Sequence, residues 1–176
     1  MKKISGGALI TKILIQNGIS KAFCVPGESY LGVLEAIRES KNKFDLVVCR
    51  HEGGAAYMAE AYGRLTQMPG ICFVTRGPGA CNASIGVHTA YHEGTPLILF
   101  VGQVPVKSLK KNAFQSIDTD KFFNSMAKYT ETIKDPKNIR KILEKAIYIS
   151  TEGKPGPVVL AIPEDIQFAM VSDKIS

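Results

Sequence analysis

The stretch V-V-C-R-H-E-G-G-A-A-Y-M-A-E-A-Y at residues 47–62 decides the fold class. The apolar run at residues 44–49 predicts a buried parallel strand, and the glycines and alanines that follow predict a closely packed helix. Between the two stands Arg50-His51-Glu52, which places a carboxylate at the carboxyl end of a strand. Ligands of open parallel sheets bind at that edge, so Glu52 is our candidate for a functional acid.

The same residues also have a purely structural interpretation. Glu52 would then only cap a helix N-terminus, where a negative charge is favoured by roughly 0.3 to 1 kcal/mol. Gly53-Gly54 would only permit a tight turn. This segment alone favours the structural interpretation, and the segments that follow change the balance.

Apolar strands alternate with helical segments along the whole chain. The strands are expected at residues 21–25, 44–49, 71–75, 97–101, 129–133 and 158–162. This alternation predicts an α/β fold with a doubly wound, mostly parallel sheet of about six strands and helices on both faces. The chain has 176 residues, which suits one domain, and we place that domain at residues 1–167 and the start of a linker at 168–176. Residues 102–117 show little periodicity, and a loop of that length is often functional.

The four cysteines contain no C-x-x-C pair, and three of them fall in apolar strand-like runs. This pattern is typical of buried, reduced thiols in a cytosolic protein rather than of a zinc site or a disulfide framework. Cys81 is the exception, because it stands in a glycine-rich segment where it could be exposed. No apolar stretch approaches the ~20 residues that a membrane span needs, so we expect a cytoplasmic protein without membrane contact.

The chain is basic, with a formal net charge of +6. Its excess cations cluster at residues 107–111 and along one helix at residues 137–145, whose other face is apolar. Aromatic residues do not interleave with these charges as a nucleic-acid platform requires. A solvated face is therefore the preferred interpretation, and no nucleic-acid partner is expected.

A glycine-rich segment, Arg76-Gly77-Pro78-Gly79-Ala80-Cys81-Asn82, follows the third strand. It resembles the dinucleotide fingerprint G-x-G-x-x-G only weakly, since Asn82 replaces the third glycine. Either its glycines let a ligand approach the backbone, or the segment is a turn that only joins strand to helix. The three histidines lack metal-ligand spacing, and motifs of serine hydrolases and P-loop enzymes are missing, so no protein-held metal is expected.

Several ordered motifs together resemble one family, the thiamine-diphosphate enzymes of the acetolactate synthase (acetohydroxyacid synthase) group. The resemblance is to their N-terminal pyrimidine-binding (PYR) domain and covers about residues 5–167. The motifs that carry it are Val25-Pro26-Gly27, Arg50-His51-Glu52-x-x-Ala55-Ala56, Thr75-x-Gly77-Pro78-Gly79-x-x-Asn82, Gly102-Gln103-Val104-Pro105, Ala113-Phe114-Gln115 and Pro155-Gly156-Pro157-Val158.

The resemblance implies a role for Glu52. In the family the equivalent carboxylate hydrogen-bonds a ring nitrogen of the cofactor's aminopyrimidine and favours its imino tautomer, which then deprotonates the thiazolium carbon. That carbon attacks a 2-oxo acid, and loss of carbon dioxide precedes carboligation to a second carbonyl. The resemblance also implies that Pro26, Gly27, Thr75, Gly79 and Asn82 line the pyrimidine pocket and that Gln115 faces the reacting end. Glu28 departs from the pattern, since synthases usually carry a small residue there and decarboxylases an acid.

Family members hold the diphosphate through Mg²⁺ with a G-D-G motif in a separate C-terminal domain, and no G-D-G occurs in this sequence. The resemblance therefore implies that the chain alone is inactive and that Mg²⁺ enters only through a missing diphosphate-binding domain or subunit. It allows FAD in the full-length enzyme, bound by a central domain, and it implies a homodimer or higher oligomer formed through the Glu52 helix. The alternatives are a non-catalytic fragment of a split gene and a 2-oxo-acid decarboxylase of the same family.

Overall fold

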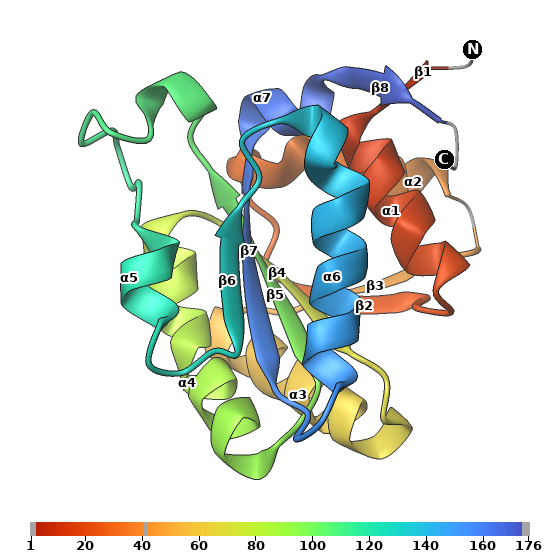
Figure 1. Ribbon diagram of the computed structural model, residues 1–176, viewed down its shortest axis with the longest axis vertical. Coiled ribbons are helices and arrows are strands. Elements are labelled where there is room, and N and C mark those ends of the chain that lie inside the picture. Colours follow the sequence, from red (N-terminus) through yellow and green to blue (C-terminus); the bar gives the residue numbers. More distant parts are fainter. Residues whose placement is uncertain (1–2, 41, 174–176) are drawn as a thin grey trace.

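A computed structural model describes residues 3–40 and 42–173 of the chain (Figure 1). Its centre is a six-stranded sheet in which every neighbouring pair is parallel, with the strand order β3-β2-β4-β5-β7-β6. The strands are β2 (Lys21–Cys24), β3 (Asp45–Val48), β4 (Gly70–Val74), β5 (Leu97–Gln103), β6 (Tyr129–Thr132) and β7 (Pro157–Pro163). The predicted α/β fold with a parallel sheet of six strands is confirmed.

Helices cover both faces of this sheet. The helices are α1 (Gly6–Gln16), α2 (Leu31–Glu39), α3 (Glu52–Thr66), α4 (Gly77–Glu93), α5 (Thr119–Phe123), α6 (Ile139–Thr151) and α7 (Glu164–Phe168). The first apolar core joins the sheet to α1, α2 and α6, and the second joins it to α3, α4 and α5. In Figure 1 α1, α2 and α6 accordingly lie to the right of the sheet, and α4 and α5 to its left.

The central strands send alternate residues into the two cores. Phe73 and Phe100 stack at 4.7 Å between ring centroids in the first core, whereas their neighbours Cys72 and Leu99 enter the second. Both faces of these strands are buried, so polar residues have no exposed position to occupy. This explains the unbroken apolar runs in β4 and β5.

The alanines and glycines of α3 and α4 allow a close approach of the two helices. A Cβ atom added at Gly86 of α4 would lie 2.6 Å from the Ala56 Cβ of α3. One added at Gly70, where β4 begins, would lie 1.8 Å from the Ala59 carbonyl oxygen. Backbone atoms therefore meet where larger side chains would otherwise separate α3 from its neighbours.

Two segments differ from the expectation. Residues 44–49 are not a buried strand, because β3 pairs only with β2 at the edge of the sheet, and Val48 is 62% exposed. Beyond α7, β8 (Met170–Ser172) pairs antiparallel with β1 (Lys3–Ser5). Part of the expected linker at 168–176 therefore forms β8, and residues 174–176 lie outside the described part; the domain boundary at 167 stays a prediction.

Each helix within residues 3–40 and 42–173 is too short or too polar to cross a membrane.

Candidate functional site

The strand order places a topological switch point at the carboxyl ends of β2 and β4. From β2 the chain moves to the edge strand β3 and then returns to add β4 on the other side of β2. The connections that leave β2 and β4 therefore run in opposite directions, and such a switch point is where open α/β sheets bind ligands. Pro26 and Gly27 follow β2, and Thr75 follows β4.

Gly27 and Thr75 are in direct contact at this switch point. A Cβ atom at Gly27 would lie 2.8 Å from the Thr75 Cβ, so no larger residue fits without displacement of the turn. The hydroxyl oxygens of Ser29 and Thr75 lie 2.9 Å apart, and Ser29 is fully buried. The turn after β2 is thus fixed against the end of β4.

Glu52 is the first residue of α3 and is half-buried. The helix cap is its neighbour His51, whose Nδ1 accepts a hydrogen bond from the Gly53 amide at 3.1 Å. Glu52 therefore does not serve as the N-cap, contrary to the structural interpretation of the sequence. Its Oε2 instead accepts a hydrogen bond from the Asn82 side-chain amide of α4 at 2.9 Å.

Gly79 connects Glu52 with Thr75. A Cβ atom at Gly79 would lie 3.1 Å from the Thr75 Cγ2 and 3.4 Å from the Glu52 Oε1. Together with the two contacts above, this forms one continuous group, which we call the Glu52 cluster: Gly27, Glu52, Thr75, Gly79 and Asn82. The tertiary structure thus brings together five of the residues predicted to contact a pyrimidine.

A second acid on α3 shows what a structural carboxylate in this chain is like. Glu60 is 6% exposed, and its Oε1 accepts hydrogen bonds from Arg64 Nε and Nη2 and from the Thr95 hydroxyl. Glu52 has a single hydrogen-bonding side-chain partner among the described residues. A carboxylate can accept about four hydrogen bonds, so Glu52 retains acceptor capacity that Glu60 has largely used.

Two predicted site residues stand apart from the Glu52 cluster. Pro26 is exposed beside Gly27. Gln115 has an exposed side chain and a left-handed backbone with φ of 59°, and its carbonyl oxygen accepts a hydrogen bond from the Gly77 amide at 2.8 Å. The loop that carries Gln115 therefore reaches the start of α4 through its backbone, without a side-chain contact to Glu52.

The glycine-rich segment is not a loop. Gly77, Pro78 and Gly79 form the first turn of α4, with proline near the helix start, where its missing N–H is no loss. Cys81 and Asn82 lie one turn further and are exposed. This turn lies at the switch point because Gly79 packs on Thr75 after the end of β4.

Sequence reasoning missed a charged group beside the Glu52 cluster. Arg76 is 9% exposed, and its guanidinium contacts Glu164 at the start of α7 and lies 3.3 Å from Glu28. These three residues follow the carboxyl ends of β4, β7 and β2. Their common position after strands was visible in the sequence, but the strand order that makes them neighbours was not.

No group of three or more His, Cys, Asp or Glu side chains within the described ranges is arranged to hold a metal ion. His88 and His92 stack on one face of α4 with ring centroids 4.5 Å apart. All four cysteines are free thiols. Cys24 and Cys72 are buried and Cys81 is exposed, as the sequence predicts, whereas Cys49, which follows the edge strand β3, is only partly buried.

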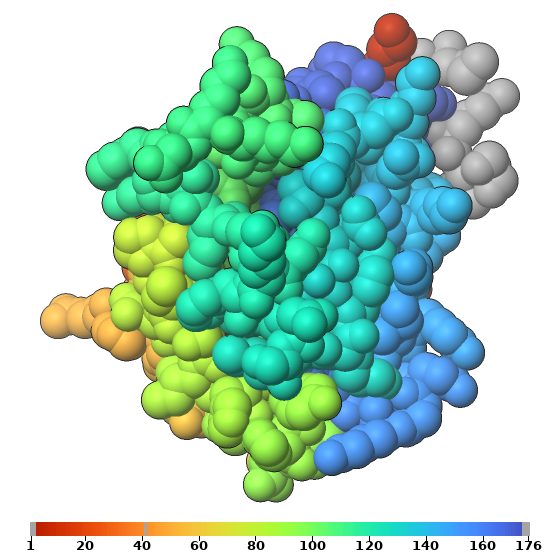
Figure 2. All heavy atoms as spheres, turned by 60° about the vertical axis from the view of Figure 1, so that its left-hand side comes forward, coloured from red at the N-terminus to blue at the C-terminus, as the bar shows by residue number. Residues whose placement is uncertain are grey.

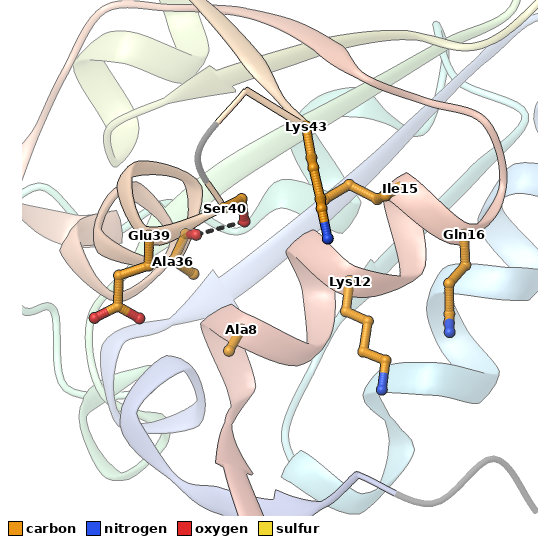
Figure 3. A pocket seen from close by; sticks show the side chains of 8 residues that line it. All are labelled: Ala8, Lys12, Ile15, Gln16, Ala36, Glu39, Ser40 and Lys43. Atoms are coloured by element: carbon orange, nitrogen blue, oxygen red, sulfur yellow. Dashed lines mark hydrogen bonds between the residues drawn. The ribbon is translucent and has the colours of Figure 1, made fainter.

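A hollow of about 400 Å³ lies between α1 and α2 (Figure 3). It includes Lys12, Lys43 and Glu39, and none of the predicted site residues lines it. Lys12 is already paired with Asp173, and Ser40 donates to the Ala36 carbonyl oxygen at 2.7 Å. These groups have local partners, so the hollow adds nothing to the chemistry of the Glu52 cluster.

The chain is similar in sequence to acetolactate synthases from several organisms. The chain is 34% identical over 172 residues to the mitochondrial acetolactate synthase catalytic subunit of Saccharomyces cerevisiae. The aligned region covers 98% of this chain and 25% of the yeast protein. It is 35% identical to the acetolactate synthase isozyme 3 large subunit of Escherichia coli, over 94% of this chain and 29% of that protein. For the acetolactate synthase of Bacillus subtilis the identity is 35%, over 93% of this chain and 28% of that protein.

The chain thus spans between a quarter and a third of the length of these relatives. Residues 4–122 match the family described as "Thiamine pyrophosphate enzyme, N-terminal TPP binding domain". That match includes the whole Glu52 cluster and the loop with Gln115. The chain therefore belongs to the family of N-terminal, thiamine-pyrophosphate-binding domains of thiamine pyrophosphate enzymes.

Proposed function

We propose that this chain is the pyrimidine-binding part of a thiamine-diphosphate-dependent enzyme that decarboxylates a 2-oxo acid and joins the product to a second carbonyl, as an acetolactate synthase does. The observation that carries the proposal is the position of Glu52. Its carboxylate lies at the switch point of the sheet, held by Asn82 and packed against Gly79.

The residues of the Glu52 cluster fit a flat aminopyrimidine ring. The ring offers polar nitrogens at its edge and flat faces without hydrogen-bonding groups. Glu52 supplies a carboxylate acceptor with spare capacity, and Gly27 and Gly79 keep the walls free of side chains. The Thr75 Cγ2 adds an apolar contact surface next to Gly79.

When bound, thiamine diphosphate supplies the nucleophilic carbon and the electron sink that decarboxylation of a 2-oxo acid requires. Glu52 would accept a hydrogen bond from a pyrimidine ring nitrogen and so hold a proton at that position. Asn82 would keep the carboxylate oriented through its 2.9 Å hydrogen bond to Oε2. A positioned carboxylate of this kind typically accelerates proton transfer by 10² to 10⁴.

The diphosphate end requires groups from elsewhere. A diphosphate binds Mg²⁺ through hard oxygen ligands, and the described residues contain no acidic cluster suited to a metal ion. We infer that another region of a longer polypeptide or a partner chain binds Mg²⁺ and the diphosphate. FAD, if the full-length enzyme uses it, would bind outside residues 1–167.

The outer surface of α3 and α4 supports a partner at this place. On α3, Tyr57 and Met58 are 41% and 45% exposed, and on α4, Ile85 and Tyr91 are 51% and 39% exposed. The Thr89 hydroxyl of α4 donates to the Tyr57 hydroxyl of α3 at 3.3 Å, so the exposed residues of the two helices form one patch. Exposed aromatic and aliphatic side chains gathered in this way are typical of an interface. Glu52 starts α3 and Asn82 lies in the second turn of α4, so a second subunit on the patch would close the site.

The four free cysteines are compatible with a reducing compartment, and we place the protein in the cytoplasm on that basis.

The test uses the chain mixed with the diphosphate-binding part of an acetolactate synthase. We expect thiamine diphosphate to bind weakly to the chain alone by isothermal titration calorimetry, without release of carbon dioxide from pyruvate. The mixture should release carbon dioxide, and Glu52→Gln should lower that rate by about 10²-fold or more, because an amide cannot hold the proton as a carboxylate does.

Glu144→Gln on α6 is the matched control, since it removes a carboxylate that pairs with Arg140 on the same helix. Its rate should equal that of the unchanged chain. If Glu52→Gln and Glu144→Gln had equal rates in the active mixture, the role of Glu52 would be wrong.

A further inference from the structure

A second cavity lies in a part of the fold that the proposed reaction does not use. It has a volume of about 470 Å³ and lies between the loop that follows β5 and the segments around α5 and β6. Figure 2 shows the surface hollowed between the green segment of this loop and the blue-green segments of α5 and β6. Cavities of 300 to 1,000 Å³ are the usual size for small-molecule sites.

Lysines surround this cavity, which we call the lysine pocket. Lys107, Lys110 and Lys111 come from the loop, and Lys134 comes from the residues after β6. Within residues 3–40 and 42–173, none of the four ammonium groups lies within 4.0 Å of a carboxylate oxygen. Four unpaired cations around one cavity repel each other, and an anion inside it would relieve that repulsion.

The two acids of the lysine pocket do not neutralise it. Asp118 caps α5 by accepting a hydrogen bond from the Lys121 amide at 3.1 Å, and its Oδ2 lies 3.5 Å from the Lys121 ammonium. That amide hydrogen bond lowers the pKa of Asp118, so its carboxylate stays ionised and offsets one of the lysine charges. Asp120 is the other acid, and the lining therefore keeps an excess of positive charge.

The remaining lining is partly apolar. Val106, Leu109 and Ile117 contribute aliphatic surface beside the lysines. A ligand with anionic groups at one end and an organic body at the other matches both kinds of surface. Lysine is a common phosphate-binding residue because its ammonium is a compact charge with three donors.

The loop is fixed on both sides of its lysines. Gln103 Nε2 donates to the Ile117 carbonyl oxygen at 2.9 Å, and the Val106 amide donates to Asp165 Oδ1 at 3.1 Å. Gln115, the candidate for the reacting end, lies on the same loop. An anion held between the loop lysines and Lys134 would tie this loop to the end of β6.

We propose that the lysine pocket is a binding site for the diphosphate group of a phosphorylated organic molecule, and that binding there orders the loop that carries Gln115. The site is separate from the Glu52 cluster, because the two share no lining residue. The class of ligand follows from the lysines and the aliphatic surface, and the effect on the loop follows from the position of three of the lysines in it.

The experiment is isothermal titration calorimetry of the chain with four probes: ADP, inorganic pyrophosphate, adenosine and citrate. We expect ADP and pyrophosphate to bind, adenosine not to bind, and the affinity to fall as NaCl rises. Tighter binding of ADP than of pyrophosphate would identify a nucleotide-like ligand, and equal binding would identify the diphosphate alone. Tighter binding of citrate than of either would overturn the assignment to phosphate.

The double variant Lys110→Gln/Lys111→Gln should weaken ADP binding by about tenfold or more, because each charge-assisted hydrogen bond contributes substantially. The control Lys43→Gln/Lys141→Gln removes the same charge from lysines outside the lysine pocket and should retain the affinity. Equal weakening by both double variants, or no ADP binding to the unchanged chain, would overturn the proposal.

Two further measurements separate this proposal from the proposed function. Glu52→Gln should leave ADP binding unchanged, and a loss would place ADP at the Glu52 cluster instead. Hydrogen exchange of residues 109–116 should slow when ADP is added, and unchanged exchange with ADP bound would overturn the ordering of the loop.

Discussion

At the residue scale, the neighbouring side chains of His51 and Glu52 at the start of α3 make different hydrogen bonds. His51 caps the helix through its Nδ1, and Glu52 is left to accept a hydrogen bond from Asn82 on α4. The residue types of 50–52 indicated a functional acid at a strand end. They did not indicate which of the two would cap the helix, because that depends on the φ and ψ angles of His51, which is extended at −151° and 137°.

The buried cysteines give the chain a predictable response to alkaline pH. Burial raises the pKa of the Cys24 thiol to about 11 from its ordinary 9.0. Between these two pH values the unfolded chain releases the proton while the folded chain keeps it, so the folded state loses stability as pH rises. Well below pH 9 both states keep the proton, so Cys24 contributes no pH dependence to the free energy of unfolding there.

Cys24→Ala should therefore reduce the fall in the free energy of unfolding between pH 9 and pH 11, as measured by urea denaturation. Cys81→Ala is the control, because Cys81 is exposed. It should show the full fall of the unchanged chain. Identical pH dependence in all three chains would show that Cys24 ionises alike in the folded and unfolded states.

At the element scale, α3 and α4 depend on backbone contact. The alanines and glycines after Glu52 predict a closely packed helix, and the 2.6 Å approach between Ala56 and a Cβ atom at Gly86 confirms it. Where the strand pattern was misleading, the cause was position in the sheet. The run at residues 44–49 is apolar apart from Asp45, but β3 has one neighbour and Val48 is 62% exposed.

Gly86→Ala should lower the free energy of unfolding by about 1 to 3 kcal/mol, because the new methyl group meets Ala56 where α3 and α4 cross. Gly54→Ala is the matched control, since no atom of another part of the chain lies within 4 Å of its Cβ position. It should be neutral or raise stability by up to about 1 kcal/mol. Urea denaturation compares the two, and equal losses would contradict the close approach.

At the scale of the whole molecule, the uncharged patch on α3 and α4 is the surface most suited to a second subunit. It contains Tyr57, Met58, Ile85 and Tyr91, on the two helices that also carry Glu52 and Asn82. Burial of such side chains on association stabilises a dimer by roughly 25 cal/mol per Å² of apolar surface, less the cost of association. The active site and the subunit contact would then share the same two helices.

Ile85→Glu should shift the chain towards monomer in sedimentation velocity, because association would bury an unpaired carboxylate. Tyr148→Glu on α6 is the control, since Tyr148 is 61% exposed on a different helix. It should leave the dimer fraction unchanged. A monomer in the unchanged chain at high concentration, or equal dimer fractions in both variants, would contradict the proposed contact.

The sequence by itself predicted the strands of the central sheet and a functional acid at Glu52. Alternation of apolar strands and helices predicted the six parallel strands, because periodicity acts over a few residues. The resemblance to the pyrimidine-binding domains, carried by short motifs, implied the Gly27, Thr75 and Gly79 group.

Only the tertiary structure decided which strand ends meet. Asn82 reaches Glu52 across 30 residues of sequence, and Arg76 joins Glu28 to Glu164 because β2, β4 and β7 end at the same edge of the sheet. The lysine pocket likewise gathers residues of the loop after β5 with Lys134 after β6. Strand order is fixed by packing over the whole molecule, and local patterns carry no record of it.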